Sequence, residues 1–176
     1  MTTAGAGAGA DLRAIEQVLH RYCAGVDRKD WDLVRSCYEP GAHDDHGNFT
    51  GTVEEFVPWL AERHTRVLQS FHAIMSVRLV DEAPGAAVTE SLCLVRQALD
   101  RGADREPFRI FLGCRYVDLF RHSEGDGWRI AHRRVTYDWV EEVARGREML
   151  VGTELPPTER GNDTIDAFRR LLHAAR

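Results

Sequence analysis

The sequence is poor in the features that mark proteins that bind nucleic acids or span membranes. Lys29 is its only lysine, and the formal net charge of −5 leaves no basic surface for a phosphate backbone. Arginine supplies the other positive charges, a bias typical of GC-rich bacterial genomes. No apolar run approaches the roughly 18 residues that span a bilayer, and residues 1–10 lack the basic and apolar regions of a signal peptide. We therefore predict a cytoplasmic protein with neither nucleic-acid nor membrane partners.

Cofactor and disulfide motifs are also lacking. The four cysteines are far apart, form no CxxC pair and mostly lie in apolar segments, where a free thiol packs as a small buried hydrophobe. The sequence contains no GxGxxG, P-loop or GxSxG motif, which argues against nucleotide cofactors and serine-hydrolase chemistry. We predict that the protein works without a cofactor.

The N-terminal half has the periodicity of helices. A length of 176 residues with 43% hydrophobic residues suits one globular domain. Residues 1–10 are of low complexity and are predicted to be a flexible tail. Three helices are predicted, the first from Asp11, the second after the N-cap Asp30, and the third from Thr52 to about Val67. Thr52 and Glu55 have the spacing of a capping box.

From Ser70 onward the apolar period changes from about 3.6 residues to 2, the period of strands. Four long strands are predicted: Phe71–Val80, Ala86–Leu99, Phe108–His122 and Gly127–Val140. Ala42–Phe49 is predicted to be a short strand edge with a turn, and Thr164–Ala174 a last amphipathic helix. Helices followed by antiparallel strands predict an α+β fold in which the helices cover one face of a curved sheet.

Several segments resemble the SnoaL-like branch of the NTF2-like superfamily. They include YCAGVDRKDWDLVRSCY, HDDHGNFTG, FHAIMSVRL, AAVTESLCLV, GCRYVDLF and GWRIAHRRVTYDWV, and together they cover about residues 11–140. The pattern is most similar to scytalone dehydratase and bile acid 7α-dehydratase. The resemblance implies a cone-shaped α+β barrel, with three N-terminal helices packed on a curved mixed or antiparallel sheet around an apolar pocket. Residues 11–144 would form this domain, and residues 145–176 an extension packed on it or on an interface.

Asp27 and His72 are the main catalytic candidates. Asp27 ends the first predicted helix, and His72 lies near the start of the first long strand. The resemblance implies a pair in which His72 is the general base, with Tyr22 at the position of a tyrosine in bile acid dehydratase. A buried carboxylate fixes the tautomer of an imidazole and stabilises its charged form. Spacing alone is equally compatible with a helix-capping Asp and a core His bonded to backbone.

The HDDHG segment contains two His and two Asp residues, the types that bind metals. Adjacent strand residues point to opposite faces, however, and no HxH or HxxxH partner follows. We therefore predict no metal site, and we expect His46 or Asp45 at the pocket mouth, with His46 assigned to substrate binding.

Two adjacent arginines lie on the last predicted strand, so only one of Arg133 and Arg134 can face inward. An inward Arg in an apolar cone requires a carboxylate, either Asp118 or a substrate anion. The resemblance favours Arg134 as the pocket residue. The remaining predicted substrate-binding residues are the aromatics Tyr116, Trp59 and Phe111.

These features predict a cofactor-independent lyase of the dehydratase type, acting on a hydrophobic cyclic, polyketide or steroid-like molecule. His72 would take a proton, Asp27 would orient it, and Tyr22 would bond the carbonyl or the leaving hydroxyl. One alternative is an isomerase like ketosteroid isomerase, or a polyketide cyclase, with the same pair and no loss of water. Another is a non-catalytic ligand-binding protein or the small subunit of a ring-hydroxylating oxygenase.

Apolar residues occupy both faces of two predicted strands, AAVTESLCLV and FRIFLGCRYVDLF. An isolated cone would leave one of these faces in water, as a larger apolar patch than monomers usually expose. We therefore predict a homo-oligomer formed through the sheet. A trimer is favoured because the dehydratases that the chain resembles are trimers, and a dimer is the alternative.

Overall fold

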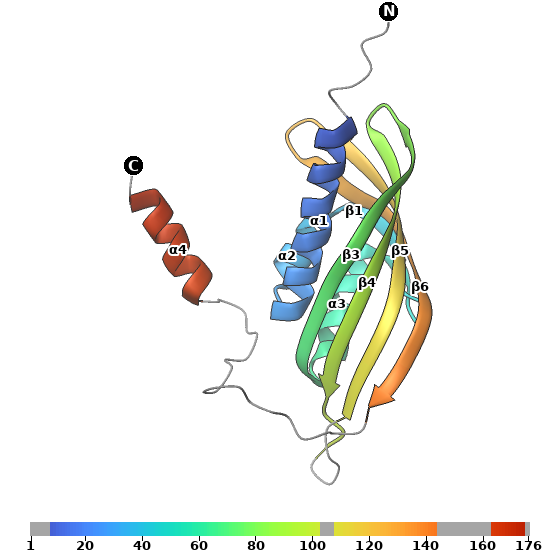
Figure 1. The fold of residues 1–176 in the computed structure, drawn as a ribbon, viewed down its shortest axis with the longest axis vertical. Coiled ribbons are helices and arrows are strands. Elements are labelled where there is room, and N and C mark those ends of the chain that lie inside the picture. Colours follow the sequence, from blue (N-terminus) through green and yellow to red (C-terminus); the bar gives the residue numbers. More distant parts are fainter. Residues whose placement is uncertain (1–7, 103–107, 144–162, 175–176) are drawn as a thin grey trace, which may run out of the picture.

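The computed structural model describes residues 8–102, 108–143 and 163–174 (Figure 1). The helices are α1 (Ala8–Arg28), α2 (Trp31–Ser36), α3 (Val53–His64) and α4 (Asp163–Ala174). The strands are β1 (Tyr38–Asp45), β2 (Thr50–Thr52), β3 (Val67–Ala83), β4 (Ala86–Leu99), β5 (Phe108–Ser123) and β6 (Gly127–Val143).

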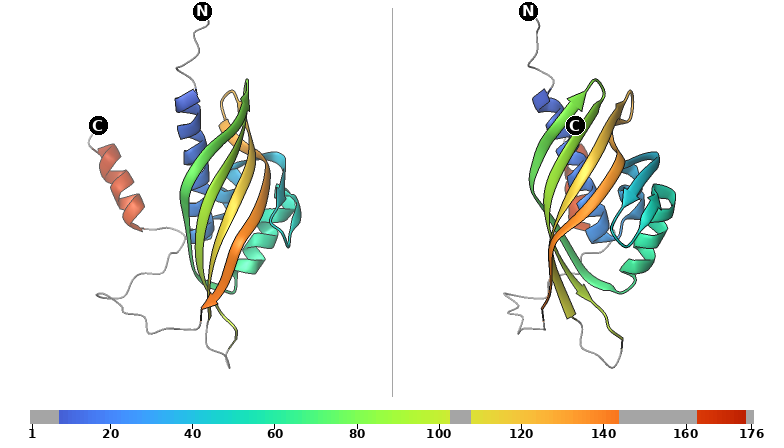
Figure 2. Two further views of the ribbon diagram at one scale, coloured as in Figure 1. Left: turned by 45° about the vertical axis from the view of Figure 1, so that its right-hand side comes forward. Right: turned by 90° about the vertical axis from the view of Figure 1, so that its right-hand side faces the viewer.

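The strands form one sheet in the order β2-β1-β6-β5-β4-β3. The sheet is mixed, because β1 runs parallel to β6 while every other neighbouring pair is antiparallel. The four long strands curve around the helices, which cover one face (Figure 2). This arrangement confirms the α+β prediction. The expectation of three N-terminal helices holds only in part, because α2 has six residues and two short strands separate it from α3.

Local sequence explains where the helices begin. The Asp30 carboxylate accepts the Leu33 backbone N–H at 3.2 Å and so caps α2. At α3 the Glu55 carboxylate accepts the backbone N–H of Thr52 at 2.9 Å, as the predicted capping box requires. A side chain at Gly25 would lie 2.8 Å from a Val34 methyl group, so glycine lets α1 and α2 approach closely.

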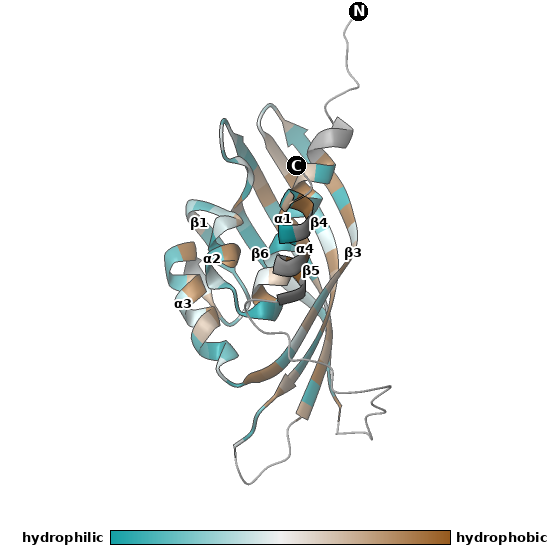
Figure 3. Cartoon of the chain, turned by 90° about the vertical axis from the view of Figure 1, so that its left-hand side faces the viewer, coloured by the Kyte–Doolittle hydropathy of each residue, from teal (hydrophilic) through white to brown (hydrophobic). Residues whose placement is uncertain are grey.

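Burial alternates along β4, so that every second side chain faces the concave side of the sheet. Hydrophobic and hydrophilic residues alternate along the long strands in Figure 3. The inward residues meet the apolar face of α1, and both sets are almost completely buried. The α1 face comprises Ile15, Val18, Leu19, Tyr22 and Val26. All four cysteines are free, buried thiols, as expected of small hydrophobes in the core.

Helix α4 lies apart from the other elements in Figure 1 and in the left-hand view of Figure 2. Its Phe168 and Leu172 side chains are exposed. Residues 145–162 and 175–176 of the extension lie outside the described residues, so the packing of the extension stays a prediction. Within the described ranges, no helix is long and apolar enough to cross a membrane.

Candidate active site

A cavity of about 400 Å³ lies between the concave face of the sheet and helices α1 and α3. Its apolar lining comes mainly from three neighbouring strands and includes Val95, Ile110, Leu112, Val135 and Val140. Polar side chains occur at a few places in this lining, and three of them are histidines: His46, His64 and His72. A mostly apolar cavity with a few convergent polar groups is typical of a small-molecule site.

His72 is held by Asp27 through two hydrogen bonds. The His72 ring nitrogen Nδ1 lies 2.7 Å from Asp27 Oδ1, and the His72 backbone N–H donates to Asp27 Oδ2 at 3.0 Å. An ionised carboxylate only accepts, so Nδ1 carries the proton and Nε2 has the free lone pair. The two side chains are only 9% and 14% exposed, and the imidazole lines the cavity. The pair has the geometry of an oriented general base.

Three tyrosines line the cavity, and two of them, Tyr22 and Tyr116, are almost completely buried with hydroxyls that remain protonated. Burial raises the pKa of Tyr22 and of Tyr116 well above the ordinary value. Both residues are therefore neutral hydrogen-bond donors near pH 7. Trp59 also lines the cavity, and its ring lies 5.1 Å from that of Phe49. The structure thus brings Tyr22, Tyr116 and Trp59 to the cavity that contains His72.

Two predicted binding residues lie elsewhere. Arg134 points away from the cavity, with a side chain 70% exposed and its Nε 3.5 Å from Asp45. Phe111 lies on the outer face of β5, beneath the guanidinium of Arg96, while its neighbours Ile110 and Leu112 line the cavity. In both cases the strand alternation places the adjacent residue inward. Arg133, not Arg134, is the inward arginine.

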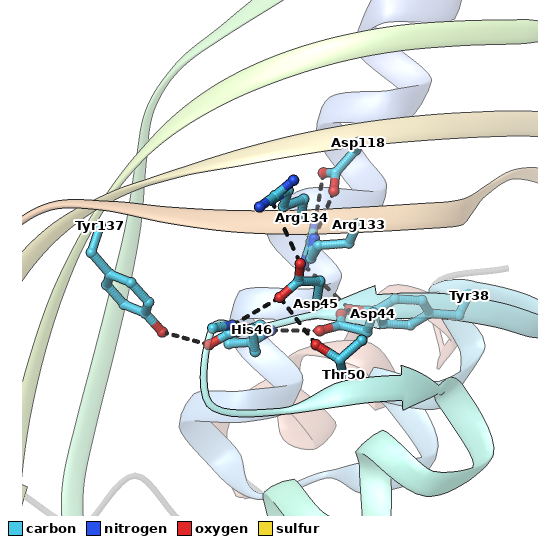
Figure 4. Close-up of polar contacts among 10 residues, drawn as sticks. Tyr38, Asp44, Asp45, His46, Thr50, Asp118, Arg133, Arg134 and Tyr137 are labelled. Atoms are coloured by element: carbon cyan, nitrogen blue, oxygen red, sulfur yellow. Dashed lines mark hydrogen bonds and ion pairs between the residues drawn. The ribbon is translucent and has the colours of Figure 1, made fainter.

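Arg133 is the centre of a buried row of charges on three strands. In the sheet register it lies beside Asp44 of β1 and opposite Asp118 of β5, and all three residues are fully buried. Its Nε and Nη2 each donate to Asp118 at 2.7 Å. The Tyr38 hydroxyl donates to Asp44 at 2.7 Å and lies 3.5 Å from Arg133 Nη1 (Figure 4). The row is a satisfied polar network within an apolar core.

Tyrosine rings complete the surroundings of Arg133. Its guanidinium carbon lies 4.3 Å from the centre of the Tyr22 ring and 4.2 Å from that of Tyr116. Burial lowers the pKa of Arg133, but the attraction and hydrogen bonds of Asp118, together with the neighbouring Tyr38 and Tyr22, more than offset it and hold that pKa well above its ordinary value. Arg133 therefore stays charged and fixes two of the tyrosines that line the cavity.

His46 approaches the same cavity from β1. Its Nδ1 lies 2.7 Å from Asp44 Oδ1, and its ring stacks on Phe56 with 4.9 Å between centres. Asp45 is directed to the other side of the strand, where it lies near Arg134. Of the two residues expected at the pocket mouth, His46 is the one that lines the cavity.

His64 is a cavity residue that sequence reasoning missed. It lies at the end of α3, where its Nδ1 donates to the Leu60 carbonyl at 2.8 Å and its Nε2 lies 3.4 Å from Gln97 Nε2. Burial lowers the pKa of His64 to about 4, so its imidazole is neutral near pH 7. The sequence did contain a signal for it: His64 follows Leu60 by four residues, which places it on the apolar face of the predicted third helix.

The lowered pKa of His64 predicts an acid-sensitive fold. The unfolded chain binds a proton at this histidine below about pH 6.5, whereas the folded protein binds it only near pH 4. The contribution is therefore present above pH 6.5 and is lost as the pH falls towards 4. We expect the free energy of unfolding to fall by about 2 kcal/mol more in wild type than in His64→Gln between pH 7 and about pH 4.5. Urea titrations at both pH values measure this difference, and equal losses in the two proteins would contradict it.

Metal binding has no evident site in the part of the chain that the structure describes. There, no three His, Cys, Asp or Glu side chains are arranged to hold a metal ion. The histidines of the HDDHG segment diverge, because His43 contacts His132 on β6 while His46 lines the cavity.

Comparison with known proteins identifies the family. The model of the SnoaL-like domain matches residues 9–134, and the chain belongs to this family. Its fold is the NTF2-like fold that the sequence predicted. No functionally curated protein matches the chain.

Solved structures share this fold at low sequence identity. A candidate scytalone dehydratase from Novosphingobium aromaticivorans is 16% identical with a TM-score of 0.67, over 82% of this chain and 96% of that one. The hexachlorocyclohexane dehydrochlorinase LinA-type3 from Novosphingobium barchaimii is 16% identical with a TM-score of 0.66, over 84% and 96%. ActVI-ORFA from Streptomyces coelicolor is 16% identical with a TM-score of 0.61, over 74% and 96%.

Proposed function

We propose that the protein is a cofactor-independent lyase of the dehydratase type, acting on a hydrophobic cyclic molecule of polyketide or steroid-like character. The observation that carries this proposal is the His72–Asp27 pair at an apolar cavity, with Nδ1 bonded to the carboxylate and Nε2 available to a ligand. Similarity in fold to a candidate scytalone dehydratase and to a dehydrochlorinase supports the same reaction class.

The proposed reaction begins with proton removal from carbon. A ketone in the cavity places the acidic carbon next to its carbonyl against His72 Nε2, which accepts the proton. Asp27 stabilises the resulting imidazolium through the 2.7 Å hydrogen bond. The hydroxyl of Tyr22, which stays protonated, donates to the carbonyl oxygen where negative charge develops. The bond from the next carbon to its hydroxyl then breaks with the electron pair going to oxygen, the double bond forms, and the departing oxygen takes a proton from a donor in the cavity or from solvent and leaves as water.

An isomerase or cyclase uses the same base without loss of water, so the product decides between them. We would incubate the protein with 3-hydroxy-1-tetralone, which gives 1-naphthol on dehydration, and with 3-cyclohexenone, which gives its conjugated isomer at unchanged mass. Dehydration predicts turnover of the first ketone, measured by product mass and naphthol fluorescence. Turnover of the second alone would favour the isomerase. A rate no greater than that of His72→Gln on both ketones would contradict the proposal.

We also propose that the chain assembles through the outer face of its sheet, with a trimer favoured over a dimer. This face exposes large apolar side chains on three of its strands, β3, β5 and β6, namely Phe71, Met75, Val80, Val117 and Trp139, which are 38–63% exposed. Several large apolar side chains exposed on one face of a sheet favour an interaction site.

Sedimentation velocity at micromolar concentration is expected to show about three times the 19.9 kDa monomer mass. Met75→Glu should shift the protein towards monomer, because it introduces a charge into the interface. Arg13→Glu, on the exposed side of α1, serves as the matched surface change and should leave the mass unaltered. A monomeric wild type would refute this assembly.

A further inference from the structure

The cavity contains a second histidine–aspartate pair, His46 and Asp44, on a different element from the first. Asp44 is fully buried, with one carboxylate oxygen 2.7 Å from His46 Nδ1 and the other accepting the Tyr38 hydroxyl at 2.7 Å. The Tyr137 hydroxyl donates to the His46 carbonyl at 3.2 Å (Figure 4). These contacts, with the ring stacked on Phe56, fix the imidazole. Because Nδ1 is held by Asp44, Nε2 is the ring nitrogen that a ligand in the cavity meets.

The buried charges around His46 are negative on balance. The fully buried charged groups near it are Asp44 on β1, Arg133 on β6 and Asp118 on β5, whereas Arg63 of α3 lines the same cavity from an exposed position. Two carboxylates with one guanidinium leave a buried excess of one negative charge, which is costly when uncompensated. The tyrosine that bonds Asp44, Tyr38, is neutral, since burial raises its pKa well above the ordinary value. An imidazolium at His46 brings this buried cluster to zero net charge.

The first pair also carries one negative charge when its histidine is neutral, but Asp27 is 14% exposed whereas Asp44 is fully buried, so that charge costs less. Asp27 is the one carboxylate that bonds His72. A neutral His72 with its proton on Nδ1 gives each oxygen of that carboxylate a hydrogen bond, one from Nδ1–H and one from the backbone N–H. The two histidines of one cavity thus have different electrostatic surroundings. Environments that favour different protonation states in two groups assign the acid and the base of a reaction.

We propose that His46 is the general acid that protonates the leaving group. This proposal rests on the proposed function, in which His72 is the base. As His72 Nε2 accepts the proton from carbon, the bond from the neighbouring carbon to the hydroxyl breaks with its electron pair going to oxygen. His46 Nε2–H gives its proton to that oxygen, the carbon–carbon double bond forms and water leaves. His72 then returns its proton to solvent, and His46 recovers one from solvent.

A general acid matters in proportion to how poor the leaving group is. Hydroxide needs protonation, whereas acetate or a nitrophenolate departs as a stable anion. We would therefore compare wild type with His46→Gln on 3-hydroxy-1-tetralone and 3-acetoxy-1-tetralone, which give the same 1-naphthol. The base itself is measured separately by the ring opening of 5-nitrobenzisoxazole, in which proton removal from carbon expels a nitrophenolate without an acid. His43→Gln is the matched control, because His43 lies on β1 three residues before His46 but does not line the cavity.

We expect His46→Gln to lower the rate on the hydroxyketone by at least about 100-fold. The same variant should lower the rates on the acetoxyketone and on 5-nitrobenzisoxazole by less than about 5-fold. Equal losses on the two ketones, or no loss on the hydroxyketone, would overturn the role of His46. So would a wild type that opens 5-nitrobenzisoxazole through His72 but dehydrates no hydroxyketone. A wild type whose 5-nitrobenzisoxazole rate is insensitive to His72→Gln contradicts the proposed function instead. In that case, a rate loss in His46→Gln that is larger for the hydroxyketone than for the acetoxyketone would still show that His46 is the general acid.

Discussion

His72→Gln is expected to lower the rate of 5-nitrobenzisoxazole opening by about 10²–10⁴-fold, the usual contribution of a positioned general base. Glutamine approximates the size of imidazole but has no lone pair of suitable basicity, so the cavity remains while the base is lost. The absorbance of the released nitrophenolate gives the rate. His132→Gln, at an exposed position on β6, is the control and should retain wild-type activity.

Asp27→Asn should reduce the same rate by a comparable factor, although it only replaces one carboxylate oxygen by an NH₂ group. The Asp27 carboxylate accepts two hydrogen bonds from His72, one from the backbone N–H and one from Nδ1–H. An asparagine accepts at its oxygen only, so its NH₂ group must face one of these two sites. If the oxygen keeps the backbone bond, the NH₂ group faces Nδ1 and drives the imidazole proton to Nε2. Full activity in Asp27→Asn, with a fold as stable as wild type, would contradict the role given to this carboxylate.

Arg133→Met is expected to lower the free energy of unfolding by about 3–5 kcal/mol, the cost of leaving a buried charge without its partner. Methionine fills part of the space, but Asp44 and Asp118 then have no cation between them. Urea denaturation followed by tryptophan fluorescence measures the change.

Arg134→Met is the matched control for this measurement, because it removes the same group one position along the strand. Its pair with Asp45 is largely exposed, so the loss should be less than about 1 kcal/mol. Adding Asp118→Asn to Arg133→Met should recover part of the stability by removing one unpaired charge. Similar losses of unfolding free energy in the two arginine variants would show that the buried row stabilises the fold no more than an exposed ion pair does.

Much of the fold could be predicted from the sequence, because it depends on period and caps. The change of apolar period near Ser70 marked the long strands, and the Thr52–Glu55 spacing located the start of α3. The parallel pairing of β1 with β6 was not predictable, because β1 is short and polar and its place between β2 and β6 is set by tertiary contacts.

The parts of the site that depend on the phase of a strand, that is, on which of two adjacent residues faces inward, could not be predicted from the sequence. The distance between Asp27 and His72 along the chain has no period, and only the resemblance suggested the pair, which the structure brings within 2.7 Å. The inward arginine and the orientation of Phe111 depend on phase, which register shifts in β5 and β6 alter by one residue. The row Asp44–Arg133–Asp118 requires the register of three strands, which no single segment encodes.

The central claim is that His72 presents an unprotonated Nε2 to the cavity because Asp27 holds the proton on Nδ1. Nitrogen-15 NMR of histidine-labelled protein at about pH 8.5 tests this directly, with His72→Gln used to assign the signal. We predict the Nδ1–H tautomer for His72 in wild type, a change of its Nε2 resonance when 5-nitrobenzisoxazole is added, and a return to the Nε2–H tautomer in Asp27→Asn. A wild-type His72 with its proton on Nε2 would contradict the account.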